Sequence, residues 1–285
     1  NWNDIANCDM IFPPLPEQTA IAEFLDKKTA LIDKAIDIKK KEIILLKERR
    51  QVIIQQAVTY GLDPNVNMKE SGVEWIGEIP ERWQVKKLRY LAYCFPSNVD
   101  KHSKSNEKDV RLCNYTDVYK NDYITDDMDL MNATASDDQI TKFSLKVNDI
   151  VITKDSETAS DIAVPTFIKE KLTNVVCGYH LAIIRTHQDN YSKYLFQALK
   201  TKLFNAQFEI CANGITRVGL GNSDLKNGIF LVPSSSEQIQ IAEFIEKSNS
   251  KIATAISLKE MEIEKLKEYK ATLINSAVTG KIKVS

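Results

Sequence analysis

The stretch 15-LPEQTAIAEF-24 decides the fold of this chain, because its central motif returns as 237-EQIQIAEF-244. Residues 4–59 align with residues 224–279 without a gap, and both units close on Ala-Val-Thr before a glycine. A repeat of this length marks a structural unit that occurs twice. The 285-residue chain is therefore expected to hold two copies of one element around an unrepeated middle.

Each copy has the pattern of a long helix. Proline precedes each copy (Pro16 and Pro233), glycine follows each copy (Gly61 and Gly280), and neither residue type interrupts the interior. Apolar residues recur at spacings of three and four, which is typical of a coiled-coil seam. The residues expected to pair the two helices are Ile21, Leu25, Ile32, Ile36, Ile43, Leu46, Ile53, Ile241, Ile245, Ile252, Ile256, Ile263, Leu266 and Leu273.

The two helices are expected to pair with each other and to run antiparallel. A helix this long has no core of its own, so its apolar stripe needs a partner. One copy leads into the middle of the chain and the other leads out of it, so both contact the middle at one end. Polar residues interrupt both seams at equivalent places, Lys39 with Lys259 and Arg50 with Lys270. Their stems are expected to lie along the seam; the alternative is that they fix the register or meet a partner subunit.

The first 14 residues match the segment that precedes the second copy. The aligned pairs are Asp4 with Asp224, Ile5 with Leu225, Asn7 with Asn227 and Pro13 with Pro233. Residues 1–14 are therefore expected to be the tail of a missing preceding domain. The chain has neither an initiator methionine nor a signal peptide, which favours a piece of a longer protein.

Composition narrows the classes of function. The formal net charge of −1 gives no overall basic field, so any nucleic-acid surface must be local. The five cysteines are scattered without metal-ligand spacing, and no metal is expected. No apolar run approaches the roughly 20 residues that cross a bilayer, and no membrane partner is expected.

The middle of the chain, residues 74–233, follows a polar linker at residues 62–73. Its β-rich runs are DVRLCNY (109–115), DIVITKD (149–155), IAVPTFI (162–168), NVVCGYHLAIIR (174–185) and IFLVP (229–233), and one helical pattern spans residues 190–208. The predicted fold class is α+β, with one mixed α/β domain plus two long antiparallel helices that form a coiled coil. The helical units are expected at residues 15–61 and 234–285.

Catalytic signatures are absent from the sequence. It has no P-loop, no glycine-rich loop with an (N/D)PP(Y/F) motif, and no evident nuclease carboxylate cluster. The histidines His102, His180 and His187 lack the spacing of a nucleophile and its base. His180 is expected at a strand edge, where a structural role is the commoner one and a ligand-facing role the alternative. The chain is therefore not expected to be an enzyme.

Three polar stretches of the middle domain are unusual for a pure scaffold. They are LCNYTDVYKND (112–122), ITKDSETASDIA (152–163) and ANGITRVGLGN (212–222). Glycines let backbone N–H groups approach phosphates, and Arg and Asn side chains pair with base edges. A solvated loop explains any one stretch alone, but together they favour a local DNA surface. The residues expected near DNA are Lys154, Ser156, Asn213, Thr216 and Arg217, followed by Tyr115, Lys120, Tyr179 and His180.

These motifs together resemble the specificity (S) subunit of type I restriction–modification systems. The resemblance rests on LPEQTAIAEFLDKKTALIDKAI (15–36) and its repeat, on ESGVEWIGEIPERWQVKKL (70–88), and on LVPSSSEQIQIAEFI (231–245). Within the middle domain, LCNYTDVYKN, ITKDSET, CGYHLAIIR and ANGITR are similar to one type of target-recognition domain. The resemblance covers essentially the whole chain.

The resemblance implies a non-catalytic subunit that reads one half of a split double-stranded DNA target. Its helices would dock methyltransferase (modification) subunits, and a restriction/translocase subunit would join through the complex. No cofactor is expected on this chain, since S-adenosylmethionine would bind the modification subunit. The implied location is the cytoplasm of a bacterium or archaeon.

The chain departs from the family pattern because it holds one recognition domain where two are usual. It is expected to be the second half of an S subunit or a half-length form, and a half-length form could dimerise to read an inverted repeat. Two other classes stay open. One is a coiled-coil protein–protein scaffold without DNA specificity, and the other is the recognition module of a fused restriction–methylation enzyme.

Overall fold

A computed structural model describes residues 12–284, apart from the side chain of residue 190. Most of the predicted tail at residues 1–14 therefore lies outside the described residues. The described residues divide into a two-helix unit, formed by residues 12–50 and 249–284, and a domain of residues 51–248. The two long helices, α2 (Leu15–Tyr60) and α8 (Ser235–Val278), contribute to both units.

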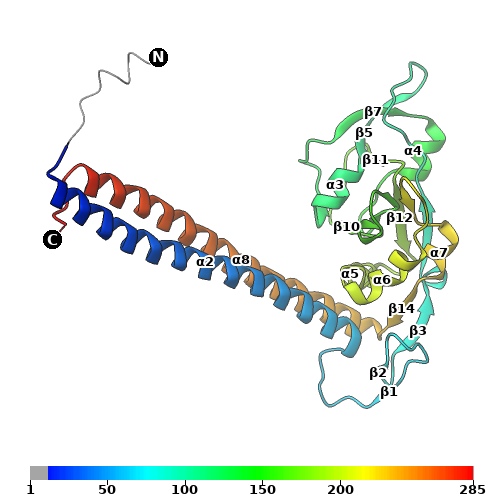
Figure 1. The fold of residues 1–285 in the computed structure, drawn as a ribbon. Helices are drawn as coiled ribbons and strands as arrows, with labels where there is room; N and C mark the ends of the chain where they lie inside the picture. Colours follow the sequence, from blue (N-terminus) through cyan, green and yellow to red (C-terminus); the bar gives the residue numbers. More distant parts are fainter. Residues whose placement is uncertain (1–11, 285) are drawn as a thin grey trace. The chain divides into compact units, whose positions relative to one another are not determined.

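The two-helix unit is an antiparallel pair, as the repeat predicted. Lys39 Nζ lies 2.9 Å from Glu262 Oε2, and Lys259 Nζ lies 3.0 Å from Glu42 Oε2. Residue numbers therefore rise along α2 where they fall along α8, so the helices are antiparallel, and they run side by side (Figure 1). Ile32, Ile36, Ile43, Ile263 and Leu273 are buried along the seam, and Leu25, Ile256 and Leu266 pack beside them.

The polar interruptions of the seam form ion pairs between the helices. In the repeat, Lys259 is the equivalent of Lys39 and Glu262 is the equivalent of Glu42. The lysine of each helix therefore pairs with the equivalent glutamate of the other helix, so the two ion pairs are related by symmetry. The lysine side chains are 27% exposed, which leaves them partly packed on the seam. The lysines thus lie partly along the seam while their ammonium groups meet carboxylates of the facing helix, and a role in fixing the register stays a prediction.

The domain of residues 51–248 combines strands with short helices. Its strands are β1 (Met68–Glu70), β2 (Glu78–Pro80), β3 (Gln84–Lys87), β4 (Ala92–Pro96), β5 (Lys108–Cys113), β6 (Tyr123–Ile124), β7 (Met131–Ala135), β8 (Ile150–Thr153), β9 (Asp155–Ser156), β10 (Pro165–Ile168), β11 (Val175–Cys177), β12 (Leu181–Thr186), β13 (Val218–Gly219) and β14 (Ile229–Val232). Its short helices are η1 (Leu88–Tyr90), α3 (Tyr115–Lys120), α4 (Asp137–Phe143), η2 (Ala159–Asp161), α5 (Asp189–Leu199), α6 (Lys202–Cys211) and α7 (Asn222–Asn227).

The main sheet of the domain has the order β4-β12-β8-β10-β6, and its inner strands β8 and β10 are buried on both faces. Its strands are antiparallel except for the parallel pair β10 and β6. Alternate residues of a strand point to opposite faces, and Ile150 and Ile152 accordingly join one hydrophobic cluster while Val151 joins the other. The second cluster also takes in residues of the smaller sheet β11-β5-β7.

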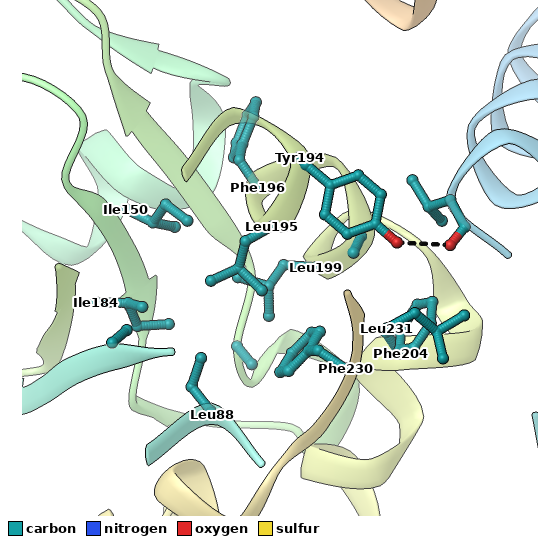
Figure 2. Packing of buried hydrophobic residues seen from close by; sticks show 14 of the residues in the cluster. Leu88, Ile150, Ile184, Tyr194, Leu195, Phe196, Leu199, Phe204, Phe230 and Leu231 are labelled. Carbon is teal, nitrogen blue, oxygen red and sulfur yellow. Dashed lines mark hydrogen bonds between the residues drawn. The ribbon is translucent and has the colours of Figure 1, made fainter. Parts of the chain in front are cut away.

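The first cluster includes the ends of both long helices. Figure 2 shows Tyr194 and Phe196 of α5 among Ile150, Ile184 and the other labelled side chains. The Tyr194 hydroxyl donates to the carbonyl oxygen of Val58 at 2.8 Å. Ile54, Val58, Ile241 and Ile245 are at most 1% exposed in this cluster. The predicted pairing residues Ile241 and Ile245 thus belong to the domain core. At the other predicted positions, Ile252 is buried, whereas Ile21, Leu46 and Ile53 are half-buried.

Three segments differ from the elements predicted for them. The helical pattern at residues 190–208 forms two helices, because Thr201 is extended and its hydroxyl caps α6 by accepting from Phe204 N. The run at residues 174–185 forms β11 and β12, separated at Gly178–His180. The polar linker at residues 62–73 contains β1, which pairs with β2 in a hairpin.

Candidate nucleic-acid interface

The loop at residues 213–219 projects three side chains from a closed base. Asn213 and Gly219 exchange backbone hydrogen bonds, N to O, of 3.1 and 2.9 Å. Gly214 has a φ of +149°, and a Cβ there would lie 1.9 Å from the carbonyl oxygen of Arg217, so the turn requires glycine. At the tip, Ile215, Thr216 and Arg217 are exposed, and Ile215 is fully so.

The base of this loop pairs with the stretch that follows β8. Strand β13 pairs with β9, so Gly219 lies opposite Asp155 and Val218 opposite Ser156. Leu220 N donates to Lys154 O at 2.8 Å, and Lys154 N donates to His180 O at 2.8 Å. The structure therefore brings the second and third polar stretches together, and the turn between β11 and β12 with them.

A chain of hydrogen bonds links three side chains from these segments. His180 Nδ1 lies 3.1 Å from Asp155 Oδ2, and Arg217 Nη1 lies 2.9 Å from His180 Nε2. A guanidinium carries donors only, so Nε2 must accept and the imidazole proton must sit on Nδ1, directed at the carboxylate. This geometry assigns His180 as the neutral Nδ1–H tautomer.

The carboxylate of Asp155 is balanced by its neighbours. Lys154 Nζ lies 2.7 and 2.8 Å from its two oxygens. Gly219 makes room for this arrangement, since a Cβ there would lie 2.9 Å from Asp155 Oδ1. With His180 neutral and Lys154 paired with Asp155, Arg217 keeps an exposed positive charge, which suits a polyanionic partner.

Helix α3 supplies an aromatic border beside this cluster. The Tyr115 hydroxyl lies 2.9 Å from Ser156 Oγ, and the Tyr115 and Tyr119 rings stack with centroids 5.5 Å apart. Tyr119 donates to Asp161 Oδ1 at 3.1 Å, and this hydrogen bond raises the pKa of the phenol. The two hydroxyls of α3 therefore tie this helix to Ser156 and Asp161 of the 155–161 segment.

Most of the residues predicted near DNA fall in this cluster. The hydrogen bonds above connect Lys154, Ser156, His180, Arg217 and Tyr115, while Asn213 and Thr216 belong to the loop and the Tyr179 ring lies against His180. Ser156 is 5% exposed. Lys120 is exposed in the last turn of α3. Contact of these residues with DNA stays a prediction.

Sequence reasoning missed Asp155 and Tyr119 as members of the cluster. Asp155 was visible only as one acid of the Asp155-Ser156-Glu157 run, because its partners His180 and Arg217 are distant in sequence. Tyr119 lies one helical turn after Tyr115, a spacing that places the two rings on one face of a helix. That spacing was the available signal for Tyr119.

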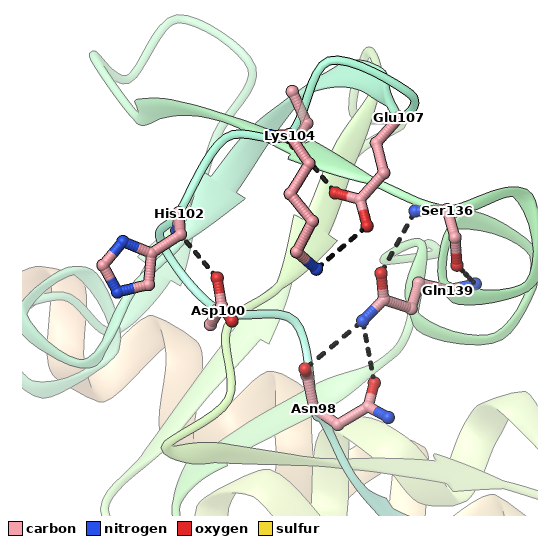
Figure 3. Close-up of polar contacts among 8 residues, drawn as sticks. Asn98, Asp100, His102, Lys104, Glu107, Ser136 and Gln139 are labelled. Atoms are coloured by element: carbon pink, nitrogen blue, oxygen red, sulfur yellow. Dashed lines mark hydrogen bonds and ion pairs between the residues drawn. The ribbon is translucent and has the colours of Figure 1, made fainter.

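The other two histidines have ordinary surroundings. Figure 3 shows His102 beside a separate cluster of polar side chains that includes Asp100, with the His102 ring directed away from that cluster. The backbone N–H of His102 donates to Asp100 Oδ1 at 2.7 Å. In the same cluster Lys104 pairs with Glu107 at 3.2 Å, and Gln139 donates to Asn98. The His187 ring packs edge-on against Tyr93 at 4.5 Å. These contacts hold loops in place and place neither histidine at the candidate interface.

Residues 12–284 contain neither a metal-binding cluster nor a membrane-spanning helix. In that part of the chain, no group of three or more His, Cys, Asp or Glu side chains is arranged to hold a metal ion. Nor does any helix among the same residues combine the length and apolar content required to cross a bilayer.

Comparisons with known proteins point to one family. Residues 80–267 match the family model described as the type I restriction modification DNA specificity domain. The chain is 23% identical over 282 residues to the type I restriction enzyme MjaVIII specificity subunit of Methanocaldococcus jannaschii, covering 98% of this chain and 63% of that protein. It is also 23% identical over 303 residues to the MjaX specificity subunit of the same organism, covering 61% of that protein.

Solved structures share the fold at low sequence identity. A chain from a structure of the type I R-M system superposes with a TM-score of 0.70 at 13% identity, covering 98% of this chain and 63% of that chain. The HsdS subunit of Thermoanaerobacter tengcongensis gives a TM-score of 0.55 at 13% identity, covering 99% and 63%. These likenesses confirm the predicted fold class of a mixed domain with two long helices. The chain spans under two thirds of the length of each of these relatives.

Proposed function

Because the chain belongs to the type I restriction modification DNA specificity domain family, we propose that its domain at residues 74–233 reads one half of a split double-stranded DNA target. The observation that carries this proposal is the cluster at the 213–219 loop, where Arg217 is exposed and held by His180. Arginine is the commonest side chain to read a base edge, and phosphate contacts would set the register. The non-catalytic role agrees with the names of the relatives, which are specificity subunits.

The two-helix unit is proposed to dock methyltransferase subunits, which would bind S-adenosylmethionine and act on a base that leaves the stack. A stripe on α2 supports this, since Leu31, Ile38 and Leu45 recur every seven residues and are 56, 47 and 62% exposed. Their repeat equivalents on α8 are Lys251, Leu258 and Lys265, so the stripe is a feature of the first copy. Exposed apolar stripes of this kind mark protein–protein contacts.

The docking proposal predicts different effects for two neighbouring apolar residues. Leu45→Lys should weaken binding of the methyltransferase subunit, because it places a charge in the stripe. Ile44→Lys is the matched control, since Ile44 is 56% exposed but lies about 100° away around the helix. Equal losses for the two variants in a titration of the assembled subunits would contradict the stripe as a docking face.

The DNA-reading role is tested by the salt dependence of binding. The chain assembled with its methyltransferase subunits should bind DNA with an affinity that falls linearly with salt on a log–log scale. Arg217→Ala should weaken this binding by more than ~1 kcal/mol without loss of helix content in circular dichroism. A pure coiled-coil scaffold predicts no such DNA binding, so wild-type affinity for the variant, or salt-independent behaviour, would count against the proposal.

The assembly is proposed to act in the cytoplasm and to recruit a restriction/translocase subunit through the complex. A half-length chain would need a second copy to supply the other recognition domain, and a symmetric pair would read an inverted repeat. Light scattering of the chain with its methyltransferase subunits and DNA tests this, and a strict single copy would contradict it. The recognition module of a fused enzyme stays the alternative, and its catalytic residues would lie outside this chain.

A further inference from the structure

The arginine at the end of the Asp155–His180–Arg217 chain is held in one orientation before any ligand arrives. Asp155 is 16% exposed and His180 23% exposed, so the two inner members of the chain are mostly buried. The backbone of His180 is also fixed, because its carbonyl oxygen accepts from Lys154 N and Asp155 N. Only Arg217 is presented to solvent.

The hydrogen bond that Arg217 donates to His180 leaves a pair of guanidinium donors free for a ligand. One N–H of Nη1 is directed at the imidazole, and a guanidinium has five N–H donors in a planar fork. The donors that remain still include a parallel pair on one edge. Such a pair matches two adjacent acceptors, which the O6 and N7 atoms of guanine provide in the major groove.

A DNA phosphate also offers two acceptors, but the surroundings of Arg217 favour a groove. Ile215 is fully exposed two residues before it on the same loop tip, and an apolar side chain gains nothing beside a phosphate. In the major groove the same side chain would meet base edges and thymine methyl groups. Nearby Asp155 would repel phosphates, but Lys154 balances its charge at 2.7 and 2.8 Å.

We infer that Arg217 reads a guanine in the major groove of the target and that Asp155 and His180 are positioning residues that set its orientation. This inference rests on the proposed DNA-reading function and adds the base that this residue recognises. It requires the Nδ1–H tautomer of His180, because the other tautomer would direct N–H groups from both residues at each other. It also assigns Asp155 a role that needs no contact with DNA.

The test is a base-preference profile of the chain assembled with its methyltransferase subunits, obtained by selecting bound sequences from random DNA. Wild type should prefer guanine at one position by roughly ten-fold or more, since a good bidentate pair discriminates at that scale. Arg217→Ala should abolish the preference at that position and leave the others unchanged. Arg89→Ala is the matched control, because Arg89 lies in η1, outside the cluster, and it should leave the whole profile unchanged.

The positioning role has its own variant. His180→Phe keeps a planar ring beside Tyr179 but removes the acceptor for Arg217. It should lower the guanine preference at the same position while the affinity for random DNA and its salt dependence stay near wild type, because the charge of Arg217 remains. ¹⁵N chemical shifts of the wild-type imidazole should show a protonated Nδ1 and an unprotonated Nε2, and a protonated Nε2 would overturn the assignment.

The outcomes separate this inference from the proposed function. If Arg217→Ala weakens binding to all sequences equally and the base profile keeps its shape, Arg217 contacts a phosphate and the inference is wrong, while the DNA-reading function stands. If the wild-type assembly shows no salt-dependent DNA binding, both the inference and the proposed DNA-reading function are wrong. Melting curves should overlay for wild type and Arg217→Ala because Arg217 is exposed, so a changed profile cannot be blamed on unfolding.

Discussion

The two-helix unit and the domain place repeated residues in different surroundings. Leu25 and Ile245 are equivalent positions of the repeat, yet Leu25 is half-buried on the seam and Ile245 is fully buried in the domain core. The ion pairs of the two regions also differ in burial. Lys39 and Glu262 of the two-helix unit pair at the surface, whereas Asp149 of the domain, which pairs with Arg185, is 1% exposed. One repeated sequence therefore serves both as a coiled coil and as part of a globular core.

Truncating the two equivalent apolar residues should give the largest contrast. Ile245→Ala is expected to cost about 4 kcal/mol, because it leaves a cavity in a closed core. Leu25→Ala is expected to cost about 1.5 kcal/mol, because half of its side chain is already in water. Urea unfolding followed by circular dichroism measures both, and equal losses would mean that the two copies are energetically alike.

The buried ion pair of the domain should give the next largest effect. Arg185 Nε and Nη2 donate to the two oxygens of Asp149 at 2.7 and 2.6 Å. Asp149→Ala would leave the partly buried guanidinium without its counter-charge, at a cost of about 3 kcal/mol. Chemical denaturation of the full chain checks this value. A loss no greater than that of an exposed pair such as Lys40 with Asp37, removed by Asp37→Ala, would contradict it.

A smaller effect should come from restoring a missing symmetric contact. Lys270 Nζ lies 2.6 Å from Asp33 Oδ2, but the repeat equivalents are Arg50 and Ala253, and the buried Nε of Arg50 has no hydrogen-bond partner among the described residues. Ala253→Asp should create the second contact. A double-mutant cycle with Arg50→Ala should give a coupling of about 0.5 kcal/mol, and no coupling would mean that the helices are not symmetric there.

The smallest effect is a dependence of the coil on pH. Hydrogen bonds from Lys259 and Lys39 lower the pKa values of Glu42 and Glu262, respectively. A carboxylate with a lowered pKa stabilises the folded state fully above its unfolded pKa and loses that effect as the pH falls through the folded value. The melting temperature should therefore fall as the pH drops below about 4.5, the ordinary pKa of a glutamate, and Glu42→Gln with Glu262→Gln should flatten this part of the curve. An unchanged slope in the double variant would contradict the pairing.

The helical part of the fold was predictable because its signals are local and repeated. Apolar spacing gives the seam, and Pro and Gly mark the ends; Gly61 has a φ of +78° and Gly280 a φ of +70°, values that glycine adopts without strain. The break at Thr201 was not predicted, since a capping hydroxyl inside an apolar pattern is a weak signal. The entry of Ile241 and Ile245 into the domain core depends on contacts that periodicity cannot show.

The candidate site was only partly predictable, because it also depends on contacts between segments that are distant in sequence. The glycine-rich loop and the residues Lys154, His180 and Arg217 stood out by type, but their hydrogen bonds join segments that are distant in sequence. The role proposed for Asp155 depends on those bonds, which form because the β11–β12 turn and the loop before β13 both lie against β9. Residue type suggests chemistry, but the tautomer of His180 and the orientation of Arg217 come from geometry.

The most direct test of the central claim is methylome sequencing of cells that carry this chain with its methyltransferase subunits. A DNA-reading role predicts methylation at one defined motif that has two specific parts and a fixed gap between them. Arg217→Ala in the same cells should relax or abolish that motif. Methylation that is unaffected by removing the chain would contradict the account.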